Sequence, residues 1–243
     1  MFRRIFKELI TYLFNPTYEN NLTLSFFERV KLLIVILIID IIFGLIATLF
    51  PVIFISFDII EPFVGNIASA DSTSNILNLF LVNIILFPIF EELTDRLYLQ
   101  FTPLNLSISL GIWGYYLSAV IIKTSIFETN NYFLLRVVIT LVLILTLYLI
   151  LNNKIIKKYL SNFWNKNFKY IFYFSILLFG FSHLGNYIFS LTLILLSPLV
   201  LLPQLISGVT FGFTRMKLGI IWSIVLHILV NTIVNIPTML LGI

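Results

Sequence analysis

The chain contains no cysteine, which excludes disulfides, thiolate metal ligands and a cysteine nucleophile. Charge is also scarce, since only 11% of the 243 residues are Asp, Glu, Lys or Arg. Histidine occurs only twice, as His183 and His227. Chemistry that depends on ionisable side chains is therefore restricted to a few positions.

Apolar residues are abundant, because 60% of the chain is hydrophobic. A soluble domain of this length does not need so much apolar surface, and several runs approach the length of about 20 residues that crosses a bilayer. The sequence predicts an all-α polytopic transmembrane helical bundle with seven spans, in a domain covering residues 29–243. The predicted spans are 30–55, 76–100, 104–122, 133–151, 170–183, 190–214 and 218–240.

The sixth span admits an alternative, since Pro198 and Pro203 interrupt it. Two short spans here would give eight in total. A single span places Arg215 and Lys217 on the inner side, as the positive-inside rule favours. Close helix packing is expected at Gly208 and Gly212.

Residues 1–28 are expected to form an amphipathic segment at the membrane surface, because apolar residues at helical spacing alternate with Arg and Lys. No small-residue cleavage site follows, so the segment does not resemble a signal peptide. We interpret it as an anchor, with a regulatory role as the alternative.

The net charge of +4 comes from clusters that indicate membrane sidedness rather than nucleic acid binding. They predict a cytoplasmic N-terminus, with the lipid bilayer as a partner. The abundance of Ile, Asn, Phe and Lys is typical of an AT-rich bacterial gene and favours a bacterial plasma membrane. The clusters are Arg3, Arg4, Lys7, Arg29 and Lys31, then Lys154, Lys157, Lys158, Lys166 and Lys169.

The second span carries four ionisable residues within six positions: Glu91, Glu92, Asp95 and Arg96. Each such group at the bilayer centre costs about 2.5–3.5 kcal/mol on insertion scales, so the cluster predicts a functional site. Glu92 and Arg96 are four apart and can pair on one helical face. Glu91 is then left for general acid–base chemistry. A structural ion-pair cluster, the alternative, would need only Glu92 and Arg96.

Other polar positions can be related to this cluster. Pro88 is expected to kink the helix one turn before the carboxylates and to free a backbone carbonyl. Asp40 either supports the site or bonds to a neighbouring helix. Both histidines fall in predicted spans, with His183 four after Phe179 and His227 four before Asn231. We expect them to converge with the acidic pair, although a lone membrane histidine is usually an interhelical hydrogen bond.

The pattern Glu91-Glu92-x-x-x-Arg96, Phe179-x-x-x-His183 and His227-x-x-x-Asn231 resembles the CPBP (Abi-type) family of CAAX prenyl endopeptidases and bacteriocin-processing enzymes. The resemblance covers about residues 80–235. This chain has Leu97 where the family usually has glycine, adds Asp95, and inserts a helical pair before His183.

The resemblance implies an intramembrane endopeptidase that acts on a membrane-associated peptide or protein. It implies that Glu91 and His183 activate water, that His227 and Asn231 stabilise the oxyanion, and that Glu92 and Arg96 support them. The resemblance to a glutamate-type mechanism, together with the lack of a His-Glu-x-x-His motif, favours a site without metal or cofactor. The alternative is zinc held by Glu91, Glu92, His183 and His227.

Two rival functions use the same residues differently. A non-catalytic membrane scaffold or bacteriocin self-immunity protein would keep the motifs for packing. A proton-coupled transporter would use the buried carboxylates and histidines as a proton relay. Transporters tend to contain internal repeats, and none is found in the sequence.

Overall fold

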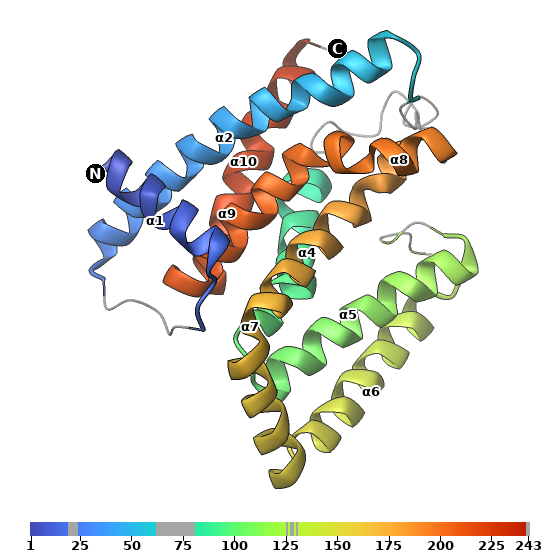
Figure 1. Cartoon of the computed structure of the whole chain (residues 1–243). Coiled ribbons are helices and arrows are strands. Elements are labelled where there is room, and N and C mark those ends of the chain that lie inside the picture. The colour runs from blue at the N-terminus through green and yellow to red at the C-terminus, as the bar shows by residue number, and fades with distance from the viewer. Residues whose placement is uncertain (19–23, 62–80, 125, 127–128, 130, 242–243) are drawn as a thin grey trace.

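The computed structural model describes residues 1–18, 24–61, 81–124, 126, 129 and 131–241, and every regular element within them is helical. The all-α prediction is confirmed for this part of the chain (Figure 1). The elements are α1 (Phe2–Phe14), α2 (Phe26–Ser56), a π-helix (Leu81–Leu86), α4 (Phe87–Asp95), a 3-10 segment (Leu97–Leu99), α5 (Pro103–Ile122), α6 (Phe133–Leu151), α7 (Lys154–Ser182), a second 3-10 segment (His183–Asn186), α8 (Leu191–Val200), α9 (Leu202–Leu218) and α10 (Ile220–Leu241).

Four helices are long and apolar enough to cross a membrane: α2, α5, α6 and α7. The α8–α9 pair, bent by 44°, makes a fifth if it is counted as one span. The seven-span prediction is thus met in part. The start of its second span and most of the preceding loop, with Asp71, lie outside the described residues. In the described part of α10, the apolar helix is shorter than a full span.

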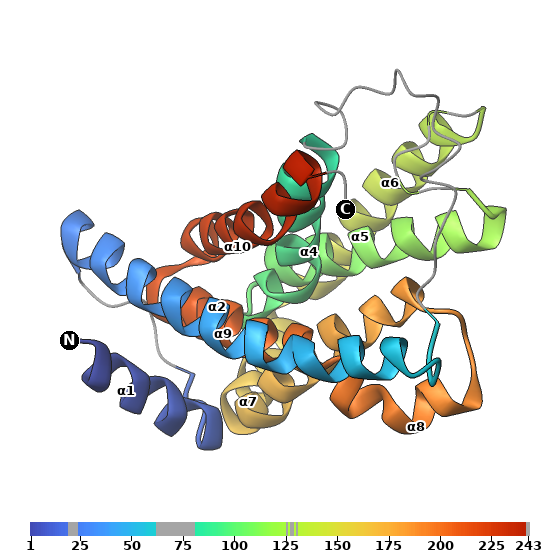
Figure 2. The same cartoon turned by 90° about the horizontal axis from the view of Figure 1, so that it is seen from above.

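Helix α1 is amphipathic as expected, but its apolar face packs against protein. Ile5, Leu9 and Tyr12 are buried in the core, and α1 contacts α2 and α9. Seen from above, α1 and the α5–α6 pair lie on opposite sides of the molecule (Figure 2). Helix α1 is therefore held by packing against other helices of the chain.

The sequence predicts a connection at residues 152–169, between the spans 133–151 and 170–183, whereas residues 154–169 form the first half of α7. Asn153 caps this helix by accepting from the Ile155 amide, and backbone torsions at Asn167 depart from helical values. Trp164 and Phe168 are buried on one face, while the five lysines are exposed on others. Burial of an aromatic face stabilises a helix that composition alone suggests is a loop.

Helix α9 packs against α7 at the two glycines, as predicted. A Cβ atom at Gly208 would lie 3.1 Å from Ile176 Cγ2, and one at Gly212 would lie 2.8 Å from Phe172 Cε2. Only residues without a side chain permit this approach. The contact brings α9 alongside the acidic cluster, since Arg96 Nη2 lies 3.6 Å from the same Gly208 position.

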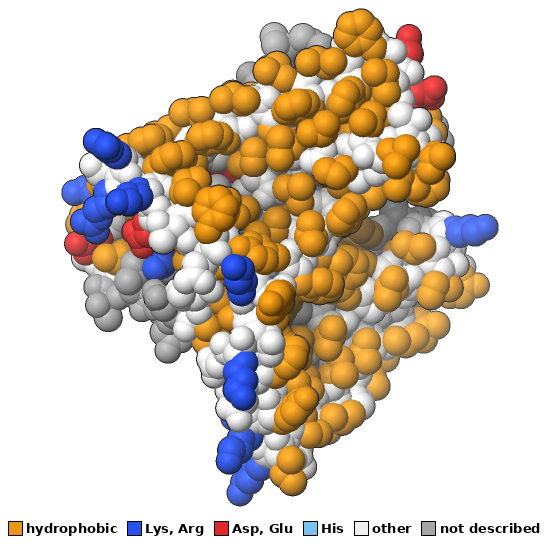
Figure 3. Space-filling view, in the orientation of Figure 1, with side chains coloured by type: hydrophobic (Ala, Val, Ile, Leu, Met, Phe, Trp, Pro, Cys, Tyr) orange, Lys and Arg blue, Asp and Glu red, His pale blue; other side chains and the backbone are white. Residues whose placement is uncertain are grey.

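Helices α5 and α6 form an antiparallel pair beside the bundle, in which Arg136 is the only buried residue of α6. Its guanidinium lies 4.2 Å from the centre of the Tyr115 ring and donates to Ser118 Oγ at 3.2 Å. Hydrophobic side chains cover much of the face shown in Figure 3, while Lys and Arg gather over α1 and the first half of α7. This distribution suits a protein surrounded by lipid.

Candidate functional site

The acidic cluster lies where α4 meets α5, α7 and α10, and Arg96 also lies close to α9. Glu92 and Arg96 are both 0% exposed. Arg96 Nε lies 3.9 Å from Glu92 Oε1, and Arg96 Nη1 lies 3.5 Å from Asp95 Oδ2. The predicted pairing of Glu92 with Arg96 is confirmed. It compensates two charges in a region where unpaired ones are costly.

His227 of α10 lies between the two glutamates. Its Nδ1 is 3.1 Å from Glu92 Oε1, and its Nε2 is 3.4 Å from Glu91 Oε2. Ser223, one turn earlier on α10, donates to the other Glu92 oxygen. Glu92 thus accepts from two groups of α10, which fixes the imidazole with Nε2 directed at Glu91.

Glu91 differs from its neighbour in exposure. Its side chain is 22% exposed, whereas that of Glu92 is fully buried. If His227 donates through Nδ1 to Glu92, then Nε2 and Glu91 can share one further proton. A carboxylate that is partly accessible and touches an imidazole can accept a proton from a reactant and return it.

Phe179 connects the second histidine to this group. Its ring centre is 4.7 Å from the His183 ring, 5.7 Å from the His227 ring and 3.9 Å from Arg96 Cζ. His183 Nδ1 lies 2.7 Å from the Phe179 carbonyl oxygen, which only accepts. The Nδ1 atom therefore carries the hydrogen, and Nε2 is left as an acceptor. Among the described residues, no contact joins His183 to Glu91.

Asn231 lies one turn beyond His227, and its Nδ2 donates to the backbone oxygen of Asn83 at 3.2 Å. Asn83 belongs to the π-helix before Pro88, and a proline five residues on has no amide hydrogen for that oxygen. Pro88 therefore cannot donate to this oxygen, which accepts from the Asn231 amide. The second hydrogen of the Asn231 amide is not needed for this bond.

Asp40 does not reach the cluster. It is 1% exposed and accepts from Thr210 Oγ1 at 2.6 Å and Ser207 Oγ at 3.2 Å. Of the two roles considered for it, the hydrogen bond to a neighbouring helix is the one seen.

Several residues of the site were not predicted from the sequence. Ser223 stands four before His227, a spacing that indicates one helical face. Phe211 of α9 stacks on His227 with ring centres 4.4 Å apart. Arg215 donates to the Arg96 and Leu97 carbonyl oxygens at 3.2 and 3.1 Å, where α4 has ended. The early end of α4, predicted to continue to Gln100, thus has its backbone groups satisfied by α9.

Several buried polar atoms beside the cluster lack a hydrogen bond of ordinary length and angle to the described residues. They belong to Asp95, Arg96, the following 3-10 segment and α5, and buried groups of this kind usually bind water or a ligand. They show that α5 brings polar groups to the cluster. The atoms are Asp95 Oδ1, the Arg96 guanidinium nitrogens, Tyr98 OH, Trp113 Nε1 and Tyr116 OH.

Zinc binding would need several ligands that converge on one point. No group of three or more His, Asp or Glu side chains among the described residues does so. The two His227 nitrogens face different carboxylates, and His183 lies beyond the Phe179 ring. The zinc set Glu91, Glu92, His183 and His227 is therefore not assembled as one site in this arrangement.

Comparison with known proteins gives no family for the chain: no protein-family model, no curated protein and no solved structure matches it.

Proposed function

We propose that this protein is an intramembrane endopeptidase that hydrolyses a peptide bond of a membrane-associated peptide or protein. The observation that carries the proposal is the contact of His227 with both Glu91 and Glu92 inside an apolar helical bundle. The proposal includes seven spans, a cytoplasmic N-terminus and an interfacial α1. It rests on the site's chemistry together with the motif resemblance.

In the proposed reaction, Glu91 removes a proton from water as the water oxygen attacks the peptide carbonyl carbon. The carbonyl oxygen becomes an oxyanion, which the second amide hydrogen of Asn231 stabilises, together with the His227 Nε2–H when that nitrogen holds the proton it shares with Glu91. The C–N bond then breaks, and the proton held at Glu91 passes to the leaving amine. Because His227 touches Glu91, it also shares in holding that proton.

His183 is proposed to orient the attacking water. Its Nε2 is the acceptor nitrogen, because Nδ1 donates to the Phe179 carbonyl oxygen. Glu92, Ser223 and Arg96 hold the His227 ring and neutralise the buried charge. The proposed site contains no metal, and activity that chelation abolishes and zinc restores would contradict that part.

The test compares membranes from cells that express the wild type or Glu91→Gln, by labelling and sequencing newly formed protein N-termini. We expect N-termini that the wild type generates and that Glu91→Gln abolishes. The matched control is Glu61→Gln, since Glu61 is exposed and far along the chain from the cluster. Identical sets of N-termini for wild type and Glu91→Gln would exclude the protease and favour a scaffold.

Proton-coupled transport is the second candidate, because Asp40 is a further buried carboxylate that contacts only hydroxyl donors among the described residues. A transporter would need Asp40 to change its protonation, so Asp40→Asn should abolish its function. The protease should keep its activity in Asp40→Asn, provided that the α2–α9 contact holds.

A further inference from the structure

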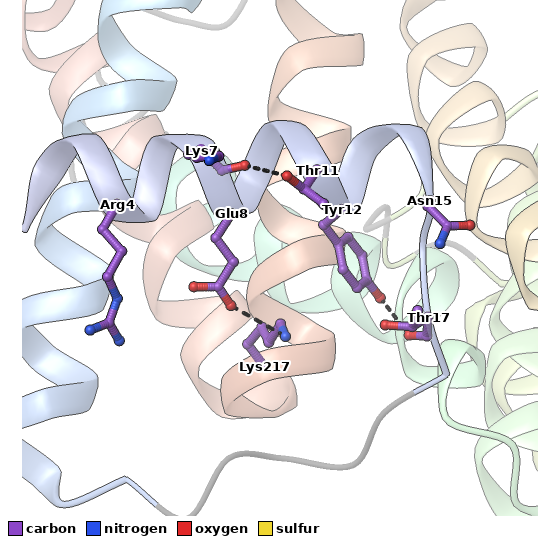
Figure 4. A pocket seen from close by; sticks show the side chains of 8 residues that line it. All are labelled: Arg4, Lys7, Glu8, Thr11, Tyr12, Asn15, Thr17 and Lys217. Carbon is purple, nitrogen blue, oxygen red and sulfur yellow. Dashed lines mark hydrogen bonds and ion pairs between the residues drawn. The ribbon is translucent and has the colours of Figure 1, made fainter.

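A pocket of about 400 Å³ lies between α1 and the C-terminal end of α9 (Figure 4). It is separate from the acidic cluster and has a different chemistry. Its charged lining residues are Arg4, Lys7, Glu8 and Lys217. The remaining lining side chains, among them Thr11 and Tyr12, carry hydroxyl or amide groups.

The charged lining is mainly cationic. Three cations, Arg4, Lys7 and Lys217, stand against one carboxylate, Glu8, which gives a formal balance of +2 for these residues. Lys217 Nζ lies 3.3 Å from Glu8 Oε1, and the Lys217 side chain is only 10% exposed. Figure 4 shows Arg4 and Glu8 extending from α1 in the same direction. Glu8 thus holds Lys217 at the pocket while the lining stays positive.

These groups match the chemistry of a phosphate. Guanidinium can donate two parallel hydrogen bonds to phosphate oxygens, and lysine supplies a compact positive charge. The pocket also lies beside exposed apolar residues of α1, since Phe2, Ile10 and Phe14 are all at least 37% exposed. A helix with exposed aromatic residues next to cationic ones is typical of the headgroup region.

We propose that this pocket binds a phosphate-bearing anion, carried either by an anionic phospholipid headgroup or by a soluble phosphate. Binding would hold α1 against α9, because the cations come from both helices. The site needs no part of the proposed peptidase reaction. Failure of either proposal leaves the other standing.

Native mass spectrometry of the purified full chain in detergent tests this directly. The probes are phosphatidylglycerol, phosphatidylcholine and inorganic phosphate. The pocket variant is Arg4→Gln with Lys7→Gln, and the control is Lys157→Gln with Lys158→Gln, which removes the same charge from exposed positions of α7. We expect the wild type and the control to retain phosphatidylglycerol over phosphatidylcholine, and the pocket variant to bind it about tenfold more weakly.

Competition between inorganic phosphate and phosphatidylglycerol distinguishes a soluble phosphate ligand from a lipid headgroup. Inorganic phosphate that binds and displaces the lipid assigns a soluble ligand, whereas phosphatidylglycerol that phosphate does not displace assigns a headgroup. Arg4→Lys with Lys7 intact should retain most of the binding and shows that the fold tolerates change at Arg4. Equal losses in the pocket and control variants, or no preference for phosphatidylglycerol and no binding of phosphate, would overturn the proposal.

Discussion

At the scale of single residues, the state of His227 determines what the site can do. One imidazole nitrogen faces a fully buried carboxylate with Arg96 near it, and the other faces a partly exposed carboxylate. The buried side fixes the ring, and the exposed side is available for proton transfer. His227 therefore both holds the site together and takes part in the proposed proton transfer.

The tautomers of the two histidines are a first prediction. In protein carrying isotope-labelled histidine, both imidazoles should show a protonated Nδ1, because each Nδ1 faces an acceptor. Glu92→Gln should change the nitrogen signals of His227 and leave those of His183 nearly unchanged. The measurement is nitrogen NMR of the reconstituted protein. His227 nitrogen signals that do not change in Glu92→Gln would contradict the contact between His227 and Glu92.

Sequence reasoning identified the acidic cluster and its expected convergence with His227, but it did not determine the individual contacts between helices. The Glu92–Arg96 pair follows from spacing of four, and both residues lie on α4. Which histidine touches Glu91 depends on how α10 is rotated relative to α4, which spacing within one helix does not determine. The resemblance places His183 with Glu91, whereas the structure has His227 in contact with it. Trp113 and Tyr116 were likewise not anticipated, because α5 enters the site from a separate helical pair.

At the scale of elements, the close packing of α9 on α7 positions Arg96 and Phe211. The glycines were recognised from their spacing. The broken helix Lys154–Ser182 was not, because its buried aromatic residues are interleaved with lysines. The composition of the first half of α7 favoured a loop, but burial of its aromatic side chains stabilises a helix.

A second prediction concerns this contact. Gly212→Ala would place a Cβ 2.8 Å from the fully buried Phe172 ring, so that the ring must shift. We expect a loss of about 1–3 kcal/mol from overpacking, partly offset by the better helix propensity of alanine, about 1 kcal/mol. The control is Gly44→Ala, because nothing lies within 4 Å of its Cβ position.

Thermal unfolding in detergent measures both variants. Gly212→Ala should lower the midpoint temperature, and Gly44→Ala should leave it unchanged or raise it. Equal shifts for the two variants would show that α9 and α7 are less tightly packed than described.

At the scale of the whole molecule, two contacts each join segments that are distant in the sequence. The Ile188 amide donates to the Glu61 carbonyl oxygen at 2.9 Å, which joins the segments after α2 and after α7. Lys217 pairs with Glu8, which joins the end of α9 to α1. A chain with a cytoplasmic N-terminus and seven spans would place the first contact outside and the second inside.

A third prediction tests that topology. Because the native sequence contains no cysteine, only an introduced cysteine can react with a maleimide. In intact cells, an impermeant maleimide should label Glu61→Cys and should not label Arg3→Cys or Lys157→Cys. All three positions are exposed in the structure, so permeabilised cells should allow each to react. Labelling of Lys157→Cys in intact cells would rule out the proposed arrangement of spans.

The exposed apolar surface of helix α6 has a consequence for how the sequence can change over evolutionary time. Arg136 is its only buried residue, and Leu143 and Ile144 pack closely on Gly114 and Gly111 of α5, so that only the exposed positions are constrained by hydrophobicity alone. Leu, Ile, Val and Phe should replace one another freely at those exposed positions, while Arg136 and the Tyr115 ring beneath it change together or not at all. Among descendants of this gene, α6 should therefore diverge fastest while its position in the fold stays fixed.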